Sequence, residues 1–219
     1  MKKFLYLISL TVIFTFVLAA TAVADTTETL YPTTISIQQY NDADADGSRD
    51  PGENLIVEMY SENNYIPKGT WTFNTFLEKY RYATGSIVDG IKQESRDTAS
   101  VQVVGTSSEK HVVMFGIANT CDIIAFTFND ADGNGLIEAE NIPISGVPIT
   151  LFGTDVFGNE VEPSTKNTDT SGYTSWNYLI PGNYSLTMTV PEGSVATTPK
   201  ECTLNPKPSE VGSGNFGLQ

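Results

Sequence analysis

Short runs in which apolar and polar side chains alternate dominate this chain. From Tyr184 to Val190 every second residue is apolar, which places these side chains on one face of a β-strand. Similar runs at 33–40, 123–128 and 147–152 lie between turn-forming residues, and the prolines that recur from Pro143 onward exclude a long helix there. The pattern predicts an all-β chain folded as sandwiches.

The chain also repeats itself. One acidic segment begins at Asp42 and a second at Asp130, 88 residues later, and each follows a strand-like run. Each half then closes on a similar phrase, Phe-Gly-Ile at 115–117 and Phe-Gly-Leu at 216–218. We therefore predict two tandem β-sandwich domains, at 33–118 and 119–219, each large enough to bury its own core.

The middle of the first domain is less regular. Trp71 and Phe73 alternate as in a strand, and so do the residues of 100–104 and 111–115. Phe73, Phe76, Leu77 and Tyr80 instead have helical spacing, so a short helix is the alternative there. We expect the same fold as in the second domain, with a divergent middle.

The first acidic segment, residues 42–53 (loop 1), has the oxygen spacing of a calcium loop. Side-chain oxygens stand at loop positions 1, 3, 5, 9 and 12, and Gly47 at position 6 lets the chain turn back toward the ion. Five acidic side chains in so short a segment repel each other unless a cation is bound. The expected Ca²⁺ ligands are Asp42, Asp44, Asp46, Ser48, Asp50 and Glu53.

The second acidic segment, residues 130–141 (loop 2), repeats this spacing with one difference. Asn141 stands at position 12, where calcium loops usually supply a bidentate carboxylate, unless neighbouring Glu140 takes that role. A solvated acidic turn is the alternative for both loops, but two copies in one register favour calcium. The expected ligands are Asp130, Asp132, Asn134, Leu136, Glu138, Glu140 and Asn141.

In an EF-hand the calcium loop leads into a helix, and the sequence after loops 1 and 2 does not predict one. Residues 54–60 are strand-like, and residues 142–148 contain two prolines. We therefore expect the ions to stabilise the fold and not to open a helix pair as in calcium sensors.

The N-terminus predicts export. Lys2 and Lys3 precede an apolar run at 4–20 and a small-residue cleavage site at 22–24, so residues 1–24 are expected to be a signal peptide and 25–32 a linker. An uncleaved membrane anchor is the alternative, because the run is about long enough to span a bilayer. After cleavage we expect a secreted or cell-surface protein without a membrane span.

The net charge, the single histidine and the two cysteines limit the functions that this chain can have. The formal net charge of −14 argues against nucleic acid and anionic membranes as partners. His111 is the only histidine and is expected to be an ordinary strand residue, which argues against His-dependent catalysis. In an exported chain a disulfide between Cys121 and Cys202 is the default expectation, with free thiols or an intermolecular link as alternatives.

Four motifs of the second domain occur in the order seen in a known family. They are the loop at 128–135, the strand Gly146–Leu151, the core that runs from Asp169 through Trp176 and Pro181-Gly182 to Tyr184, and the final strand at 215–218. The second domain thereby resembles the calcium-binding B-type repeats of serine-aspartate repeat adhesins, relatives of the collagen-adhesin B domains. Thr174 stands where that family usually has an aromatic residue.

The resemblance implies an immunoglobulin-like or prealbumin-like sandwich that serves as a calcium-stiffened spacer. Some relatives carry a Lys–Asn isopeptide bond, which is not expected here because neither 33–40 nor 123–128 contains a lysine. We therefore predict an exported, non-enzymatic, calcium-stabilised structural or adhesin-type module. The alternative is a secreted carbohydrate- or protein-binding module, for which Tyr60, Tyr65, Tyr80 and Tyr82 are candidate contact residues. The sequence is compatible with an extracellular protein or glycan partner and also with self-assembly.

Overall fold

The computed structural model describes residues 30–89, 95–106, 109–138 and 141–219, and the side chains of 60–67 are not described. The expected signal peptide lies outside these ranges. Within them the chain forms β-strands and no helix, so none of the described residues belongs to a helix that could cross a membrane. The strands are β1 (Leu30–Asn41), β2 (Leu55–Pro67), β3 (Gly69–Asn74), β4 (Arg81–Val88), β5 (Thr98–Val103), β6 (Glu109–Asn119), β7 (Cys121–Asn129), β8 (Ile142–Pro143), β9 (Pro148–Asp155), β10 (Glu160–Asn167), β11 (Tyr173–Leu179), β12 (Gly182–Met188), β13 (Glu201–Leu204) and β14 (Val211–Leu218).

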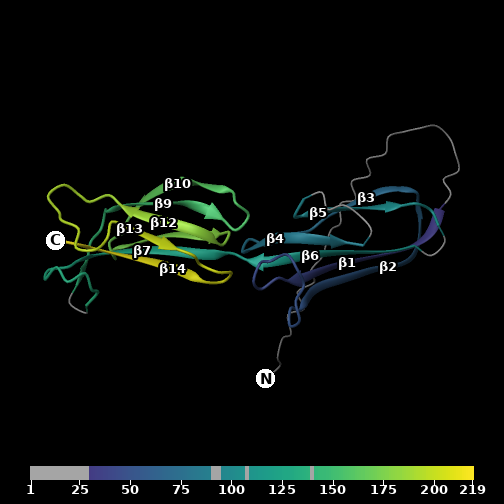
Figure 1. Cartoon of the computed structure of the whole chain (residues 1–219), viewed down its shortest axis with the longest axis horizontal. Coiled ribbons are helices and arrows are strands. Elements are labelled where there is room, and N and C mark those ends of the chain that lie inside the picture. The colour runs from purple at the N-terminus through teal and green to yellow at the C-terminus, as the bar shows by residue number, and fades with distance from the viewer. Residues whose placement is uncertain (1–29, 90–94, 107–108, 139–140) are drawn as a thin grey trace, which may run out of the picture.

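The sheets fall into two sets along the chain (Figure 1). In the first unit, β1–β6, a sheet with the order β2-β1-β6-β4 packs on the pair β3-β5. In the second unit, β7–β14, a sheet with the order β10-β9-β12-β13 packs on the sheet β11-β7-β14, with β8 beside β7. The predicted all-β class and the tandem sandwiches are confirmed.

Each unit is built around one parallel pair made by its first and last strands. β1 runs parallel to β6, and β7 runs parallel to β14, whereas the other pairs are antiparallel. Tyr40 of β1 is the register partner of Gly116, and Phe128 of β7 is that of Gly217. The repeated phrases at 115–117 and 216–218 therefore lie beside the ends of the first strands, immediately before the two acidic loops.

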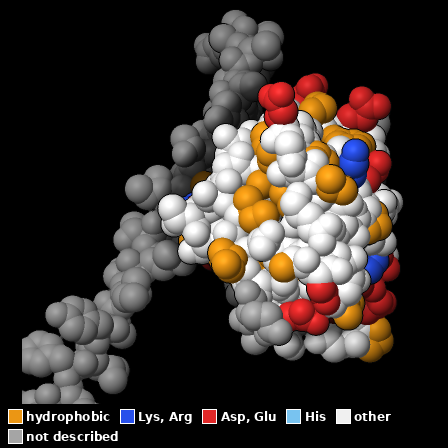
Figure 2. All heavy atoms as spheres, turned by 90° about the vertical axis from the view of Figure 1, so that its left-hand side faces the viewer, with side chains coloured by type: hydrophobic (Ala, Val, Ile, Leu, Met, Phe, Trp, Pro, Cys, Tyr) orange, Lys and Arg blue, Asp and Glu red, His pale blue; other side chains and the backbone are white. Residues whose placement is uncertain are grey.

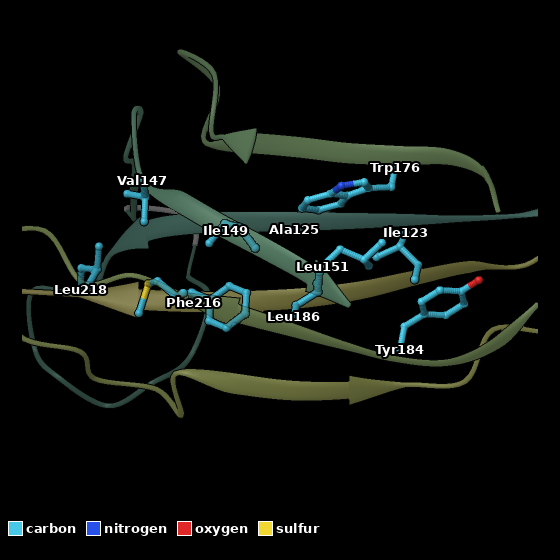
Figure 3. Close-up of a cluster of buried hydrophobic side chains, with 11 residues drawn as sticks. Ile123, Ala125, Val147, Ile149, Leu151, Trp176, Tyr184, Leu186, Phe216 and Leu218 are labelled. Atoms are coloured by element: carbon cyan, nitrogen blue, oxygen red, sulfur yellow. The ribbon is translucent and has the colours of Figure 1, made fainter. Parts of the chain in front are cut away.

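The core of the second unit follows from the alternation in the sequence (Figure 3). Tyr184, Leu186 and Met188 are buried on one face of β12, as their spacing predicts, and meet Ile123 and Trp176 from the opposite sheet. The core of the first unit is smaller and centres on Val101, Phe115 and Ile117. Burying apolar surface from both sheets at once is what fixes the layers against each other.

The middle of the first unit differs from the second. The helix considered for 73–80 is wrong, because Phe73 belongs to β3 and the residues after Asn74 form no helix. In the first unit β4 also occupies the edge of β6, whereas β14 ends its sheet in the second unit. The expected divergent middle is thus a change in sheet order and not only in sequence.

The predicted disulfide is absent, and Cys121 and Cys202 are both free. Cys202 on β13 pairs with Leu186, and its sulfur faces Gly214. Gly214 is the register partner of Ala125 on β7, four residues beyond Cys121. Four residues of strand span about 13 Å, which is too far for the roughly 4.4–6.8 Å between Cα atoms that a disulfide requires.

Candidate metal centres

Both acidic loops begin at the same point of the fold. The Asp42 N–H donates to the carbonyl of Ile117 at 3.0 Å, and the Asp130 N–H donates to the carbonyl of Leu218 at 2.9 Å. Each first aspartate thus continues the parallel pair of its unit, and both side chains are fully buried. The strands hold the first expected ligand of each loop in a fixed position.

Figure 2 shows the end of the second unit, where acidic and apolar side chains lie side by side at the surface.

Backbone amides wrap loop 1 around the Asp42 carboxylate. The N–H of Asp46 donates to Asp42 Oδ1 at 3.1 Å, and the N–H of Gly47 donates to Oδ2 at 2.8 Å. The Asp46 N–H also reaches Asp44 Oδ1 at 3.3 Å, and the Ser48 N–H reaches Asp46 Oδ1 at 2.6 Å. Carboxylate oxygens of Asp42, Asp44 and Asp46 lie within 4.8 Å of one another as a result.

Loop 2 repeats these four hydrogen bonds at the same loop positions. The Asn134 N–H donates to Asp130 Oδ1 and to Asp132 Oδ1, both at 3.2 Å. The Gly135 N–H donates to Asp130 Oδ2 at 2.7 Å, and the Leu136 N–H donates to Asn134 Oδ1 at 2.7 Å. The two loops therefore share one backbone path as well as one sequence pattern.

That path needs left-handed backbone at loop positions 4 and 6. At position 6, Gly47 has φ +81° and Gly135 has φ +75°. At position 4, loop 2 has Gly133 with φ +69°, but loop 1 has Ala45 with φ +63°. A residue with a Cβ rarely adopts this backbone conformation, so the backbone of loop 1 is strained at Ala45, whereas glycine avoids this strain in loop 2.

The side chain at position 12 closes each loop onto position 9. Glu53 Oε2 accepts the N–H of Asp50 at 3.0 Å, and Asn141 Oδ1 accepts the N–H of Glu138. Glu53 Oε1 additionally accepts the N–H of Ala43 at 2.6 Å. The corresponding atom of Asn141 is an amide nitrogen that donates to the carbonyl of Asn129. Asn141 thus reproduces the closure of the loop but supplies only one oxygen.

The electrostatics of the first aspartate differ between the loops. Burial raises the pKa of Asp42, and the negative charge of Glu53 adds to this, while Thr84 and the Gly47 N–H oppose it. The pKa of Asp130 is lowered, chiefly by the Thr197 hydroxyl. A buried carboxylate surrounded by other acids is costly unless a cation or hydrogen bonds compensate it.

The donor set fits a hard cation such as Ca²⁺. All expected ligand atoms are oxygens, and the sharp turn that brings them together is present in both loops. Asp50 and Glu138 lie at the exposed rim, whereas Glu140 lies outside the described residues. Sequence reasoning missed Thr84 and Thr197, whose hydroxyls lie against the first aspartates from distant segments. No local sequence motif predicts that either threonine lies beside a loop.

Residues 122–216 match the SdrD B-like domain. This match confirms the resemblance predicted for the second unit. The first unit lies outside the region matched to the SdrD B-like domain, although it shares the parallel pair and the loop geometry.

Other similar proteins match more of the chain. Colossin-A of Dictyostelium discoideum is 25% identical over 157 residues, which cover 64% of this chain and 1% of Colossin-A. The chain therefore spans a small part of that relative. Solved structures to which this chain is similar include the TIE protein of Bacillus anthracis, with a TM-score of 0.38 and 15% identity over 86% of this chain and 34% of that one. The minor pilin of Streptococcus agalactiae has a TM-score of 0.35 and 12% identity over 85% of this chain and 95% of that one.

Proposed function

We propose that this chain is an exported, non-enzymatic structural or adhesin-type module of the cell surface or extracellular matrix, with two calcium-stabilised sandwiches at 33–118 and 119–219. The observation that carries the proposal is the shared geometry of loops 1 and 2. Both loops follow the parallel pair of their unit, both bury the first aspartate, and both use the same four amide hydrogen bonds.

Calcium would be held mainly by the aspartates at positions 1, 3 and 5 of loop 1 and by their counterparts in loop 2. The bound ion supplies positive charge that compensates clustered carboxylates, one of which is fully buried in each loop. Loop 1 joins β1 to β2 and loop 2 joins β7 to β8, and each of these strand pairs belongs to one sheet, so fixing a loop restrains the two strands that flank it. Loop 1 offers five carboxylates and a two-oxygen group at position 12, and we therefore expect it to bind calcium more tightly than loop 2.

A structural role agrees with the surroundings of the groups that could do chemistry. His111 Nε2 lies 3.2 Å from Glu109 Oε2 on the same strand, and Glu109 is engaged by the amides of a neighbouring turn. Burial raises the pKa of the Cys121 thiol to about 12, which leaves it a poor nucleophile. Most acidic side chains of the loops accept hydrogen bonds from backbone amides of their own loop.

The alternative, a secreted carbohydrate- or protein-binding module, depends on exposed aromatic side chains. Of the four candidate tyrosines, Tyr82 is buried, Tyr80 is exposed and packs at a tilt against Tyr178, and the side chains of Tyr60 and Tyr65 are not described. A stacked pair, Phe126 and Tyr173, lies on the second unit with ring centroids 4.6 Å apart, and Tyr173 is exposed. This pair and the exposed pair Tyr80–Tyr178 favour the alternative, and glycan-array binding lost in Tyr173→Ala would support it.

Thermal unfolding with and without a chelator tests the proposed function. At free calcium about 100 times the dissociation constant, each site adds roughly 2.7 kcal/mol to the free energy of unfolding. We expect a clear fall in Tm with chelator that calcium reverses and magnesium reverses only in part, since magnesium prefers a tighter octahedral shell. An unchanged unfolding curve in chelator would contradict the proposal.

A further inference from the structure

The connection between the two units is a single residue whose backbone is bound on both sides. Thr120 separates β6 from β7. Its N–H donates to the carbonyl of Tyr80 in the first unit at 2.9 Å, and its carbonyl accepts the N–H of Ser209 in the second unit at 2.9 Å. A flexible linker leaves such groups to water, so this connection is integrated into both units.

Beside it, Tyr178 adopts a backbone conformation that tyrosine rarely takes. Its φ is +62°, at an irregularity in the pairing of β11 with β7 between Trp176 and Leu179. Its N–H donates to Asp122 Oδ1 at 2.9 Å, which holds this irregularity in place. A bulky side chain in the left-handed region carries a local cost that surrounding contacts must offset.

In this conformation the side chain of Tyr178 packs against the first unit. Its ring packs against the ring of Tyr80 with centroids 4.6 Å apart and the ring planes tilted by 58°, and Lys79 Nζ lies 4.9 Å from the Tyr178 centroid. The same lysine lies 5.5 Å from the centroid of Tyr80. The irregularity in β11 therefore directs an aromatic side chain across the junction, where it joins an aromatic and cation–π cluster.

A second set of contacts crosses the junction from the other sheet of the second unit. Phe157, in the turn between β9 and β10, meets the buried Tyr82 edge to face at 5.8 Å. The guanidinium of Arg96 lies 3.3 Å over the Phe157 ring. In addition, Asn119 Nδ2 donates to Ser209 Oγ at 2.9 Å. Contacts from both layers of the second unit oppose bending about Thr120 in either direction.

We propose that Tyr178 locks the two units into one rigid rod without a hinge at Thr120. The cost of its backbone conformation is offset by the packing of its ring on Tyr80 and Lys79, so the second unit is fixed in orientation by the first. This inference extends the proposed structural role, but it does not depend on calcium, since each contact that carries it lies outside loops 1 and 2.

Residual dipolar couplings of backbone amides test this orientation directly. The exported chain is weakly aligned in calcium-containing buffer, and one alignment tensor is fitted to each unit. We expect one common tensor for both units of the unaltered chain. In Tyr178→Gly, which keeps the left-handed backbone and removes the ring, we expect two different tensors, with weaker alignment in one unit.

Tyr173→Ala is the matched control, because Tyr173 lies on the same strand and its ring also contacts another ring at a centroid distance of 4.6 Å, but that ring is Phe126 of its own unit. It should keep the common tensor. Tyr80→Ala removes the partner ring from the other side and should reproduce the loss seen in Tyr178→Gly. Two tensors in the unaltered chain, or one common tensor in both Tyr178→Gly and Tyr80→Ala with native amide shifts in each core, would overturn the proposal. A failure of calcium binding shows separately, as amide shifts of loops 1 and 2 that do not change with chelator, whereas the tensors report only the orientation of the two folded units.

Discussion

Tyr40 lies against Gly116, its register partner on the parallel strand β6, so closely that a methyl group at residue 116 would stand 2.7 Å from the tyrosine hydroxyl. The Thr84 hydroxyl crowds the same space. Tyr40 is fully buried, two residues before Asp42 of loop 1. The small residue in the repeated phrase is thus what lets an aromatic ring fill the end of the first unit.

Gly116→Ala should therefore destabilise the first unit. Overpacking of this kind typically costs about 1–3 kcal/mol, because the ring and the strand cannot both keep their places. Gly212→Ala on β14 is the control, since the atoms nearest to a methyl group there are 3.5 Å away, an ordinary contact. Denaturant unfolding should show a lower midpoint for Gly116→Ala alone, and equal midpoints for the two variants would contradict the packing described.

Ala45→Gly should strengthen loop 1. Ala45 has φ +63°, whereas loop 2 has Gly133 at the same position, and left-handed backbone costs a residue with a Cβ about 1–2 kcal/mol. We expect the free energy of unfolding at saturating calcium to rise by up to about 1 kcal/mol, because the larger conformational entropy of glycine in the unfolded chain offsets part of the relieved strain. Ala43→Gly is the control: it makes the same change in the same loop, but Ala43 does not have a positive φ, so the variant should be neutral or destabilising. A gain of equal size in both variants would point to general loosening of the loop.

The stability of the first unit should depend on Glu109 in acid. The Thr106 N–H is the largest cause that lowers the pKa of Glu109, from 4.5 to about 2, with the Thr106 hydroxyl, His111 and the Val104 N–H adding to it. Because the folded-state pKa is depressed, the contribution of the carboxylate is present above the ordinary pKa and is lost as the pH falls toward 2.

Glu109→Gln should thus lower the midpoint of unfolding at pH 7, and the difference from the unaltered chain should shrink between about pH 4.5 and pH 2. Urea unfolding at stepped pH measures this difference. A difference that stays constant across this range would assign the effect to shape and not to charge.

Both cysteines should be found as thiols in secreted material. Burial raises the pKa of Cys121 to about 12 and raises that of Cys202 as well, so both should react slowly with a disulfide reagent in the folded protein. After unfolding, two thiols per chain should react at once. Recovery of a peptide that joins Cys121 to Cys202 under non-reducing conditions would contradict the strand register described for β13 and β14.

The features that sequence could predict are those with a local signal. Alternation at Tyr184, Leu186 and Met188 identifies the buried face of β12, and the positions of aspartate and glycine identify the turns of both loops. Both depend on residues a few positions apart, where backbone geometry alone decides what shares a face.

Features set by the pairing of distant strands could not be predicted in this way. The default disulfide fails because β13 pairs with β12 and β7 pairs with β14 in registers that no local pattern encodes, and these registers place Cys202 against Gly214 and away from Cys121. The irregularity at Tyr178 and the hydroxyls of Thr84 and Thr197 likewise depend on neighbours far along the chain. The possible helix at 73–80 shows the same limit, since the spacing of its aromatic residues fits either structure until the sheet is formed.

Calorimetric titration of the calcium-free exported chain decides whether loops 1 and 2 are calcium sites. We expect at least two sites, with one site lost in Asp42→Asn and a different one in Asp130→Asn, because each substitution removes charge from one buried first ligand while keeping its shape. The site that remains in Asp130→Asn should be the tighter one, since loop 1 has the fuller set of carboxylates. A chain that shows no calcium binding, or one whose binding is the same in both variants, would contradict the proposed calcium-stabilised module.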